Sequence, residues 1–127
     1  MGEPTIAKRL ERRFILLTAD AIIEERLRSA VPSGWEMRTT QDLEEIGDWA
    51  DILLYRFILL DLDEKGAFDP VEVIRDLRTR YMVQTAVFCF GGDAPLRDEM
   101  RLNRADRFFG RDEIVERLGS FIGQYGW

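Results

Sequence analysis

The segment from Asp61 to Glu72, DLDEKGAFDPVE, concentrates acidic side chains directly after the apolar run YRFILL. Asp61, Asp63, Glu64 and Asp69 lie within nine positions, and Glu72 ends the segment. Carboxylates this close repel one another unless a cation, a proton or solvent offsets their charge. Such a cluster fits acceptance of a phosphoryl group, binding of a metal ion, or a tight solvated turn.

An EF-hand calcium loop is one pattern that this spacing satisfies in part. Such a loop needs oxygen ligands at positions 1, 3, 5, 9 and 12 and glycine at position 6. The matching residues are Asp61, Asp63, Gly66, Asp69 and Glu72. Lys65 falls at position 5, Pro70 falls at position 10, and YRFILL predicts a strand where an EF-hand needs a helix. We therefore expect no Ca²⁺ site and favour a strand-to-helix loop whose acids Asp63, Glu64 and Asp69 are mostly solvated.

Composition excludes several classes of protein. A chain of 127 residues with 46% hydrophobic residues suits one globular domain. The net charge of −6 gives no general attraction to nucleic acid or to acidic membranes. With no histidine and the single cysteine Cys89, the usual zinc sites and histidine-dependent nucleophilic catalysis are excluded. The lone cysteine, with no apolar run of about 18 residues and no signal peptide, favours a cytoplasmic location.

Apolar runs and helical periodicities alternate along the chain after a polar lead-in at 1–12, so we expect a single domain over 13–127. The predicted strands are 13–20, 35–40, 56–63, 84–90 and 106–110. The predicted helices are 21–31, 41–50 capped by Thr40, 71–81 opened by Pro70, 95–105, and 112–125 capped by Asp112. This alternation predicts an α/β fold with a parallel sheet covered on both faces.

Ligands of such sheets bind at the carboxyl ends of the strands, beside the point where the strand order reverses. The positions at those ends are Thr18–Asp20, Asp61–Asp63, Phe90–Asp93 and Gly110–Asp112. Cys89 lies inside an apolar strand, which indicates a core residue rather than a reactive one.

From Arg13 to Tyr125 the chain resembles the receiver domain of two-component response regulators. FILLDL is similar to the third strand of that family and puts Asp61 at the phosphoacceptor aspartate; VEVIRDLR is similar to the helix that follows. NRADRFFGRDEIVERL is similar to the fifth strand and the last helix. The resemblance implies a flavodoxin-like, doubly wound sheet of five parallel strands in the order 2-1-3-4-5, with helices on both faces.

The family's phosphorylation chemistry needs residues that this sequence lacks. The family holds Mg²⁺ with an acidic pair after the first strand, where this chain has either Thr18 and Ala19 or, with a shift of one, Ala19 and Asp20. The Thr or Ser that ends the family's fourth strand falls on Phe90 or Gly91. The family's Lys-Pro pair at the fifth strand falls on Arg111 and Asp112. The loop after Asp61 is also one residue longer and lacks the usual proline.

These departures predict a degenerate pseudo-receiver. Phosphoryl transfer to a carboxylate relies on Mg²⁺ and positive side chains. With a metal carboxylate and the hydroxyl missing, we expect Arg111 to pair permanently with Asp61 or Asp20. No catalytic residue, metal ligand set or cofactor is predicted, and Mg²⁺ should bind weakly at best. The alternatives are an atypical phosphoacceptor that uses Asp61, and a residual strand-end acid without function.

A partner surface is the remaining implication of the resemblance. In receivers it is formed by the elements that correspond to helix 95–105, strand 107–110 and helix 112–124. Arg97, Arg101 and Arg104 share one flank of that helix by spacing, and Phe108 stands where the family has a switching aromatic. We therefore expect a protein partner of a signalling pathway, with a homodimer left open and with no nucleic-acid or membrane binding. A solvated flank paired with neighbouring acids is the alternative.

Overall fold

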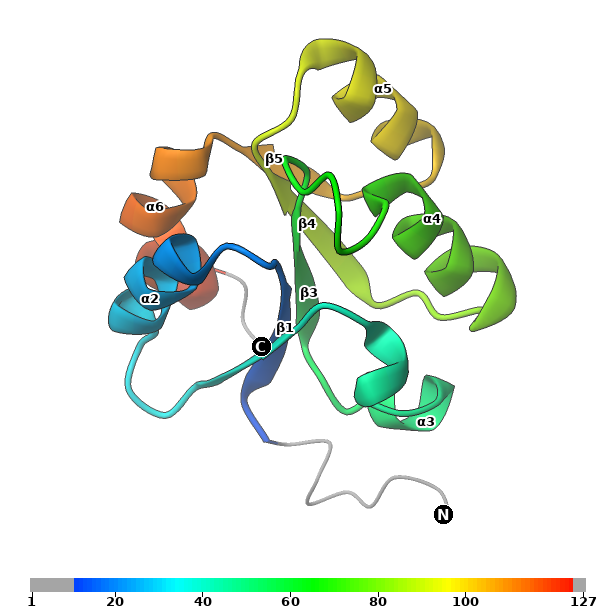
Figure 1. The fold of residues 1–127 in the computed structure, drawn as a ribbon. Coiled ribbons are helices and arrows are strands. Elements are labelled where there is room, and N and C mark those ends of the chain that lie inside the picture. The colour runs from blue at the N-terminus through cyan, green and yellow to red at the C-terminus, as the bar shows by residue number, and fades with distance from the viewer. Residues whose placement is uncertain (1–10, 125–127) are drawn as a thin grey trace.

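The computed structural model describes residues 11–124, and its centre is a sheet of five parallel strands. The strands are β1 (Arg13–Leu17), β2 (Glu36–Thr40), β3 (Phe57–Asp61), β4 (Ala86–Phe90) and β5 (Arg107–Phe109). Their order is β2-β1-β3-β4-β5, which confirms the predicted topology (Figure 1). Residues 1–10 of the lead-in and residues 125–127 lie outside the described part.

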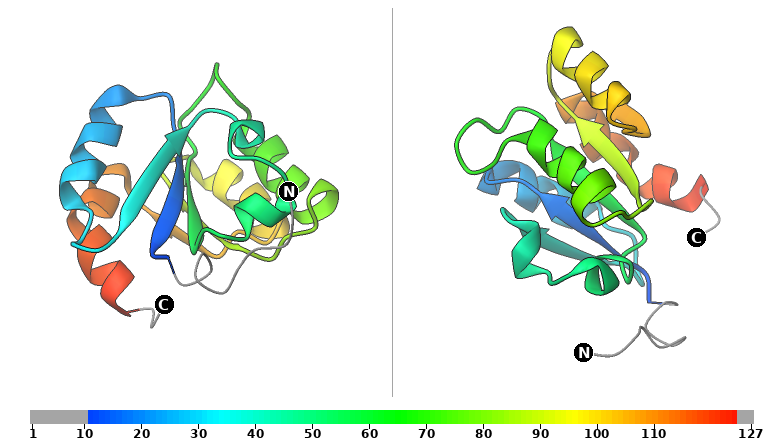
Figure 2. Two further views of the ribbon diagram at one scale, coloured as in Figure 1. Left: turned by 90° about the horizontal axis from the view of Figure 1, so that it is seen from below. Right: turned by 90° about the vertical axis from the view of Figure 1, so that its right-hand side faces the viewer.

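Helices cover both faces of the sheet, as Figures 1 and 2 show. One face carries α2 (Ala21–Ala30) and α6 (Arg111–Gln124). The other carries η1 (Leu43–Glu45), α3 (Trp49–Ile52), α4 (Pro70–Arg75) with its π-helical continuation η2 (Asp76–Arg80), and α5 (Ala94–Leu102). No helix among the described residues has the length and apolarity to cross a membrane.

Strand alternation divides the core into two layers. Phe14 and Leu16 of β1 pack in the layer that includes residues of α2 and α6. Ile15 and Leu17 pack in the layer that includes residues of α4 and α5. Because successive side chains of a strand point to opposite faces, a sheet buried on both sides needs continuous apolar strands such as FILL. This burial leaves polar groups to collect at the strand ends.

The predicted helix 41–50 is wrong. The segment forms two short pieces, η1 and α3, because each has its own cap. Asp42 accepts the Glu44 N–H at 3.0 Å, and Asp48 accepts the Ala50 N–H at 3.0 Å. Thr40 is not a helix cap, since it ends β2 and its hydroxyl bonds the backbone of Asp42. Side-chain capping thus competed with a continuous helix.

Two other predicted boundaries also change. Asp112 does not cap the last helix, which begins at Arg111; its carboxylate instead pairs with Arg26 of α2 at 3.0 Å. The Gly110 N–H before that helix donates to the carboxylate of Glu113 at 2.8 Å. Helix α5 ends at Leu102, so Arg104 of the predicted helix 95–105 lies beyond it with φ of 66°.

A buried arginine in η2 joins this helix to the segments that lead into β4 and β5. Arg78 is 6% exposed. Its guanidinium donates to the carbonyls of Val83 (3.1 Å), Thr85 (2.8 Å) and Arg104 (2.8 Å), and to the carboxylate of Asp106 (3.4 Å). Sequence analysis did not single out this residue. Its donors satisfy loop carbonyls that would otherwise be unpaired.

Arg78→Met should lower the free energy of unfolding by about 3 kcal/mol, because it removes the donor of the buried bond to the Val83 carbonyl and of the part-buried bonds to the Thr85 and Arg104 carbonyls. The matched control is Arg75→Met on the same helical segment, since Arg75 makes an exposed ion pair with Glu99. That control should change stability by about 1 kcal/mol or less. Urea unfolding at pH 7 measures both, and equal losses would contradict this role for Arg78.

Candidate functional site

The carboxyl ends of the strands gather the polar side chains that sequence analysis placed there. Thr18 follows β1, Asp61 ends β3, Phe90 ends β4 and Arg111 begins α6. Asp20 caps α2, where its carboxylate accepts the N–H groups of Ile22 and Ile23. Parallel strands end at one edge, so residues far apart in sequence meet there.

Arg111 is the centre of this site. Its Nη1 donates to Asp61 Oδ1 at 2.8 Å and to Asp63 Oδ2 at 3.0 Å. Its Nη2 donates to Asp20 Oδ2 at 2.7 Å and to Asp61 Oδ2 at 3.1 Å. The pair with Asp61 is therefore bidentate, the geometry in which a guanidinium binds a carboxylate most strongly. One guanidinium thus bridges three carboxylates, one from the β1–α2 loop and two from the end of β3 and the loop that follows it.

Asp61 is almost wholly enclosed, with 1% of its surface exposed. Besides Arg111, the Thr18 hydroxyl donates to Oδ2 at 2.7 Å and the Asp63 N–H donates to Oδ1 at 2.9 Å. Each carboxylate oxygen thus accepts two hydrogen bonds. A buried carboxylate is stable only with such partners, and here they include a full opposite charge.

Hydrogen bonds within this cluster favour the ionised form of Asp20 and the charged form of Arg111. The hydrogen bond from Arg111 lowers the pKa of Asp20, and the N–H groups at the start of α2 lower it further. The hydrogen bond to Asp61 is the main cause that raises the pKa of Arg111, and Asp20 and Asp63 contribute. Arg111 therefore stays charged at any pH at which the protein is folded.

Asp61 and Asp63 pair with an internal cation, whereas Glu64 and Asp69 of the same segment accept hydrogen bonds from nearby backbone amides. Glu64 Oε2 accepts the N–H groups of Lys65, Gly66 and Ala67 at 2.8–3.0 Å, which lowers the pKa of Glu64. Asp69 caps α4 by accepting the Val71 N–H at 3.0 Å. Asp63 and Asp69 are exposed and Glu64 is half-buried, which fits the expectation that these acids are mostly solvated. Each carboxylate is partly exposed but has a specific partner.

The calcium reading of this segment finds no support in the geometry. Strand β3 stands where an EF-hand needs a helix, and Asp61 and Asp69 bind different groups. Among residues 11–124, no three His, Cys, Asp or Glu side chains are arranged to hold a metal ion. The donor set around Asp61 does not fit a divalent cation, because Arg111 takes up oxygens of all three carboxylates.

Sequence analysis placed Asp63 at a strand end but expected it to be mostly solvated, and assigned no partner to Asp63. Its carboxylate joins Arg111 to the β4–α5 loop, because Oδ1 also accepts the Gly92 N–H at 3.0 Å. Gly91 and Gly92, with φ of 75° and 78°, adopt a conformation that favours glycine. A glycine pair at the end of a strand was the only sequence signal that another group approaches closely there. Ala19, by contrast, is exposed and contributes no side-chain group to the cluster.

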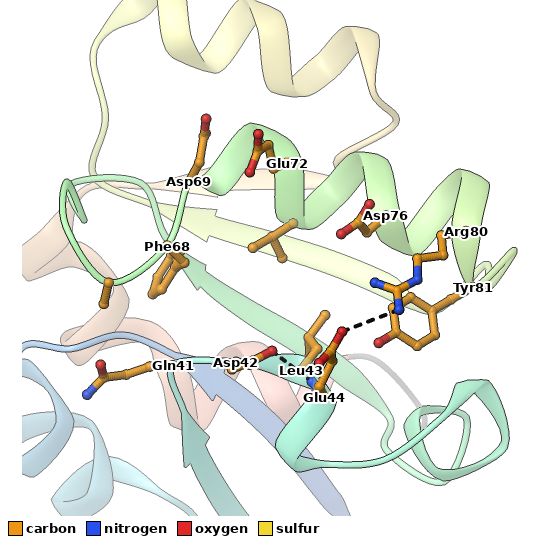
Figure 3. Close-up of a pocket in the computed structure, with 12 residues that line it drawn as sticks. Gln41, Asp42, Leu43, Glu44, Phe68, Asp69, Glu72, Asp76, Arg80 and Tyr81 are labelled. Carbon is orange, nitrogen blue, oxygen red and sulfur yellow. Dashed lines mark hydrogen bonds and ion pairs between the residues drawn. The ribbon is translucent and has the colours of Figure 1, made fainter.

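A separate groove lies between η1 and α4, with a volume of about 230 Å³ (Figure 3). Phe68 and Tyr81 contribute aromatic walls, and burial raises the pKa of Tyr81. Arg80 pairs with Glu44 across the groove at 3.3 Å. Asp69 and Glu72 are the members of the acidic segment that line it, and neither contacts Arg111. The groove is therefore distinct from the Arg111 cluster.

Comparison with known proteins gives structural matches. No protein-family model matches the sequence, and no curated protein matches it. Three of the similar solved structures are the receiver domain of the TMAO respiratory system response regulator TorR, the Mn²⁺-bound form of response regulator Rcp1, and the receiver domain of a response regulator from Bermanella marisrubri.

These structures share the whole domain. The TorR receiver domain is 18% identical with a TM-score of 0.67, and the match covers 89% of this chain and 98% of that domain's chain. Rcp1 is 10% identical with a TM-score of 0.68, covering 90% and 94%. The Bermanella domain is 20% identical with a TM-score of 0.64, covering 87% and 97%. The chain has the receiver fold. At these identities the likeness concerns the fold, and the site must be read from its own residues.

Two positions after the first strand, Thr18 and Asp20, were the alternative matches to the family's acidic pair, and they make different contacts. Thr18 points its hydroxyl at Asp61, whereas Asp20 reaches Arg111. The Phe90 side chain is fully buried, and the guanidinium of Arg111 lies 5.3 Å from its ring centre. Neither Phe90 nor Gly91 supplies a hydroxyl. An aromatic ring and a guanidinium therefore stand beside Asp61.

Of the three arginines predicted to share one flank of the partner surface, only Arg97 and Arg101 lie on helix α5. The guanidinium carbons of Arg101 and Arg97 lie 4.6 and 5.8 Å from the ring centre of half-buried Phe108. Arg101 also pairs with Asp98 at 2.8 Å. Arg104 does not continue this flank along the helix, because α5 has already ended. The arrangement is a phenylalanine covered by two arginines.

The ionised carboxylate of Asp20 should make the free energy of unfolding decrease as the pH falls into the acid range. Its pKa is lowered on folding, so its ionised form stabilises the fold above its unfolded pKa, and this contribution is lost as pH falls through the lower folded pKa. Asp20→Asn keeps a good helix cap but removes the charge. The variant should be less stable than the parent at pH 6 and nearly equal to it at pH 2.5. Urea unfolding at the two pH values measures the difference, and a difference that does not change with pH would contradict this assignment.

Proposed function

We propose that this chain is a non-catalytic signalling or adaptor module, a pseudo-receiver that binds a protein partner without ordinary phosphorylation. The observation that carries the proposal is the bidentate ion pair between Arg111 and Asp61, with distances of 2.8 and 3.1 Å. The chain supplies from its own sequence the positive charge that a receiver's phosphorylation chemistry takes from Mg²⁺ and a lysine. On this proposal the module is not an enzyme.

The state of the Asp61 carboxylate opposes phosphoryl transfer. The attacking oxygen needs a free lone pair, and charge on the transferring group needs a metal ion. Both oxygens of Asp61 already accept two hydrogen bonds each. A Mg²⁺ ion would have to displace the guanidinium of Arg111, which three carboxylates hold. Those carboxylates would then lose the positive charge that Arg111 provides. We therefore expect Mg²⁺ to bind weakly at best.

The residues that read out phosphorylation are also replaced. In a receiver, phosphate shifts a two-state equilibrium because it bonds a hydroxyl and a lysine better in one state. Phe90 and Gly91 offer no hydroxyl to a phosphoryl group, and the planar guanidinium of Arg111 is not equivalent to a compact ammonium. Even a phosphorylated Asp61 would therefore gain little difference in energy between two states.

An atypical phosphoacceptor that uses Asp61 is the second candidate. The observation that favours it is the placement of Asp61 at the end of β3 with a cation directly beside it. Rcp1, which has the same fold, was solved in a Mn²⁺-bound form. For this candidate, Arg111 must leave Asp61 before transfer and must then pair with the phosphoryl oxygens.

The proposed partner surface consists of α5, β5 and the adjoining part of α6. Phe108 with Arg97 and Arg101 supplies an apolar centre and positive charge, and Arg104 adds an exposed cation beyond α5. A protein of a cytoplasmic signalling pathway, or a second copy of the chain, fits this surface. The overall charge of −6 favours neither nucleic acid nor a membrane.

Incubation with acetyl phosphate and MgCl₂ should leave the intact mass of this protein unchanged. The physical reason is that Arg111 donates to both oxygens of the Asp61 carboxylate, which neither a metal ion nor a phosphoryl donor can then reach freely. Intact-mass spectrometry at neutral pH measures the result, with the TorR receiver domain treated in parallel as a control for the reagent. The Asp61→Asn variant identifies any modification elsewhere.

One outcome would overturn the proposal in favour of the phosphoacceptor. That outcome is a phosphoryl increment that appears in the parent protein and is lost in Asp61→Asn. An increment that persists in Asp61→Asn would be assigned to another residue and would leave Asp61 unmodified, as proposed.

A further inference from the structure

The β3–α4 loop and the β4–α5 loop are joined at one side chain. Asp63 accepts Arg111 through Oδ2 at 3.0 Å and the Gly92 N–H through Oδ1 at 3.0 Å. The preceding Leu62 N–H donates to the Phe90 carbonyl at 3.0 Å, so the two loops run side by side from the ends of their strands. Asp63 is therefore the point at which the Arg111 cluster reaches the β4–α5 loop.

The close approach of the two loops depends on two glycines. A Cβ atom at Gly91 would overlap the carboxylate of Asp63, and one at Gly92 would lie 2.8 Å from Leu62 Cδ1. The Asp63 carboxylate thus fills the space directly after β4. A glycine pair is also the most flexible dipeptide that the chain contains, so its single conformation needs an external partner.

Arg97 connects that loop to the proposed partner surface. Its Nε donates to the Gly91 carbonyl at 2.9 Å, and its Nη2 donates to the Phe109 carbonyl at 2.9 Å. The Gly91 N–H donates to the same Phe109 carbonyl at 3.0 Å. The guanidinium of Arg97 then lies against the ring of Phe108. A shift of Gly91 would therefore move the cation that covers Phe108.

We propose that the Asp63 carboxylate is a built-in latch that holds the β4–α5 loop, and through it Arg97 and Phe108, in one arrangement. This inference rests on the proposed pseudo-receiver function and names what holds its surface. Asp63 gives Gly92 an acceptor and is itself held by Arg111, so no phosphoryl group or hydroxyl is needed to order the loop. The coupling between Asp63 and Phe108 runs through contiguous contacts, from Asp63 to the Gly91–Gly92 pair and from there to Arg97.

Asp63→Ala tests the latch directly, because it removes the acceptor of the Gly92 N–H. Hydrogen exchange by nuclear magnetic resonance should become roughly tenfold faster or more at the Gly92 amide and at the Arg97 Nε–H. The signals of Phe108 should shift as well. Asp63→Asn keeps an oxygen acceptor but loses the charge that pairs with Arg111. It should retain most of the protection at Gly92 and Arg97.

Glu64→Ala is the matched control. It removes a carboxylate of the same loop whose hydrogen-bond donors are other backbone amides, namely those of Lys65, Gly66 and Ala67 and that of Ala19 in the β1–α2 loop. It should leave the exchange at Arg97 unchanged. The latch is wrong if Asp63→Ala leaves Gly92, Arg97 and Phe108 as in the parent, or if Glu64→Ala disturbs them equally. These measurements need neither partner nor phosphate, so their failure is distinct from a failure of the pseudo-receiver proposal.

Discussion

Arg111 and Asp61 form the interaction on which the carboxyl edge of this molecule depends. Asp61 ends the central strand and is 1% exposed, so its charge cannot be left to solvent. An uncompensated carboxylate in that position would cost several kcal/mol. The guanidinium of Arg111 offsets that cost and at the same time fixes Asp20 at the start of α2 and Asp63 in the β3–α4 loop. The β1–α2 and β3–α4 loops are therefore both tied to the start of α6 by one cation.

A covalently attached cation differs from a metal ion in what it permits. A bound ion exchanges with solvent and leaves coordination positions for a substrate oxygen. Arg111 does not leave the chain, and its donors are already directed at four carboxylate oxygens. An arrangement of this kind favours one conformation rather than an equilibrium between two, which is the physical basis for proposing an adaptor in place of a phosphorylation switch.

The fold was predictable because its signals are strong and repeated. Continuous apolar strands separated by amphipathic helices predict a parallel sheet. The carboxyl ends of such strands lie at one edge, so the sequence alone predicted that Thr18, Asp61 and Arg111 lie close together. The helix at 41–50 failed because Asp42 and Asp48 cap separate pieces, a local competition that periodicity does not record. Asp63 was among the strand-end residues singled out, but its pairing with Arg111 and the Gly92 amide was not predicted, because the pattern does not show which donors a strand-end carboxylate meets. Arg78 was missed altogether, because its main partners are loop carbonyls and the residue pattern does not show which carbonyls a side chain meets.

The central claim is that Arg111 and Asp61 stabilise one another inside the folded molecule, and a double-mutant cycle measures that directly. Arg111→Met, Asp61→Asn and the double variant are unfolded in urea at pH 7, and the coupling energy is taken from the four free energies of unfolding. The account predicts a favourable coupling of about 2 kcal/mol or more, because the pair is bidentate and Asp61 is enclosed. Additivity of the two single substitutions within about 0.5 kcal/mol would contradict it.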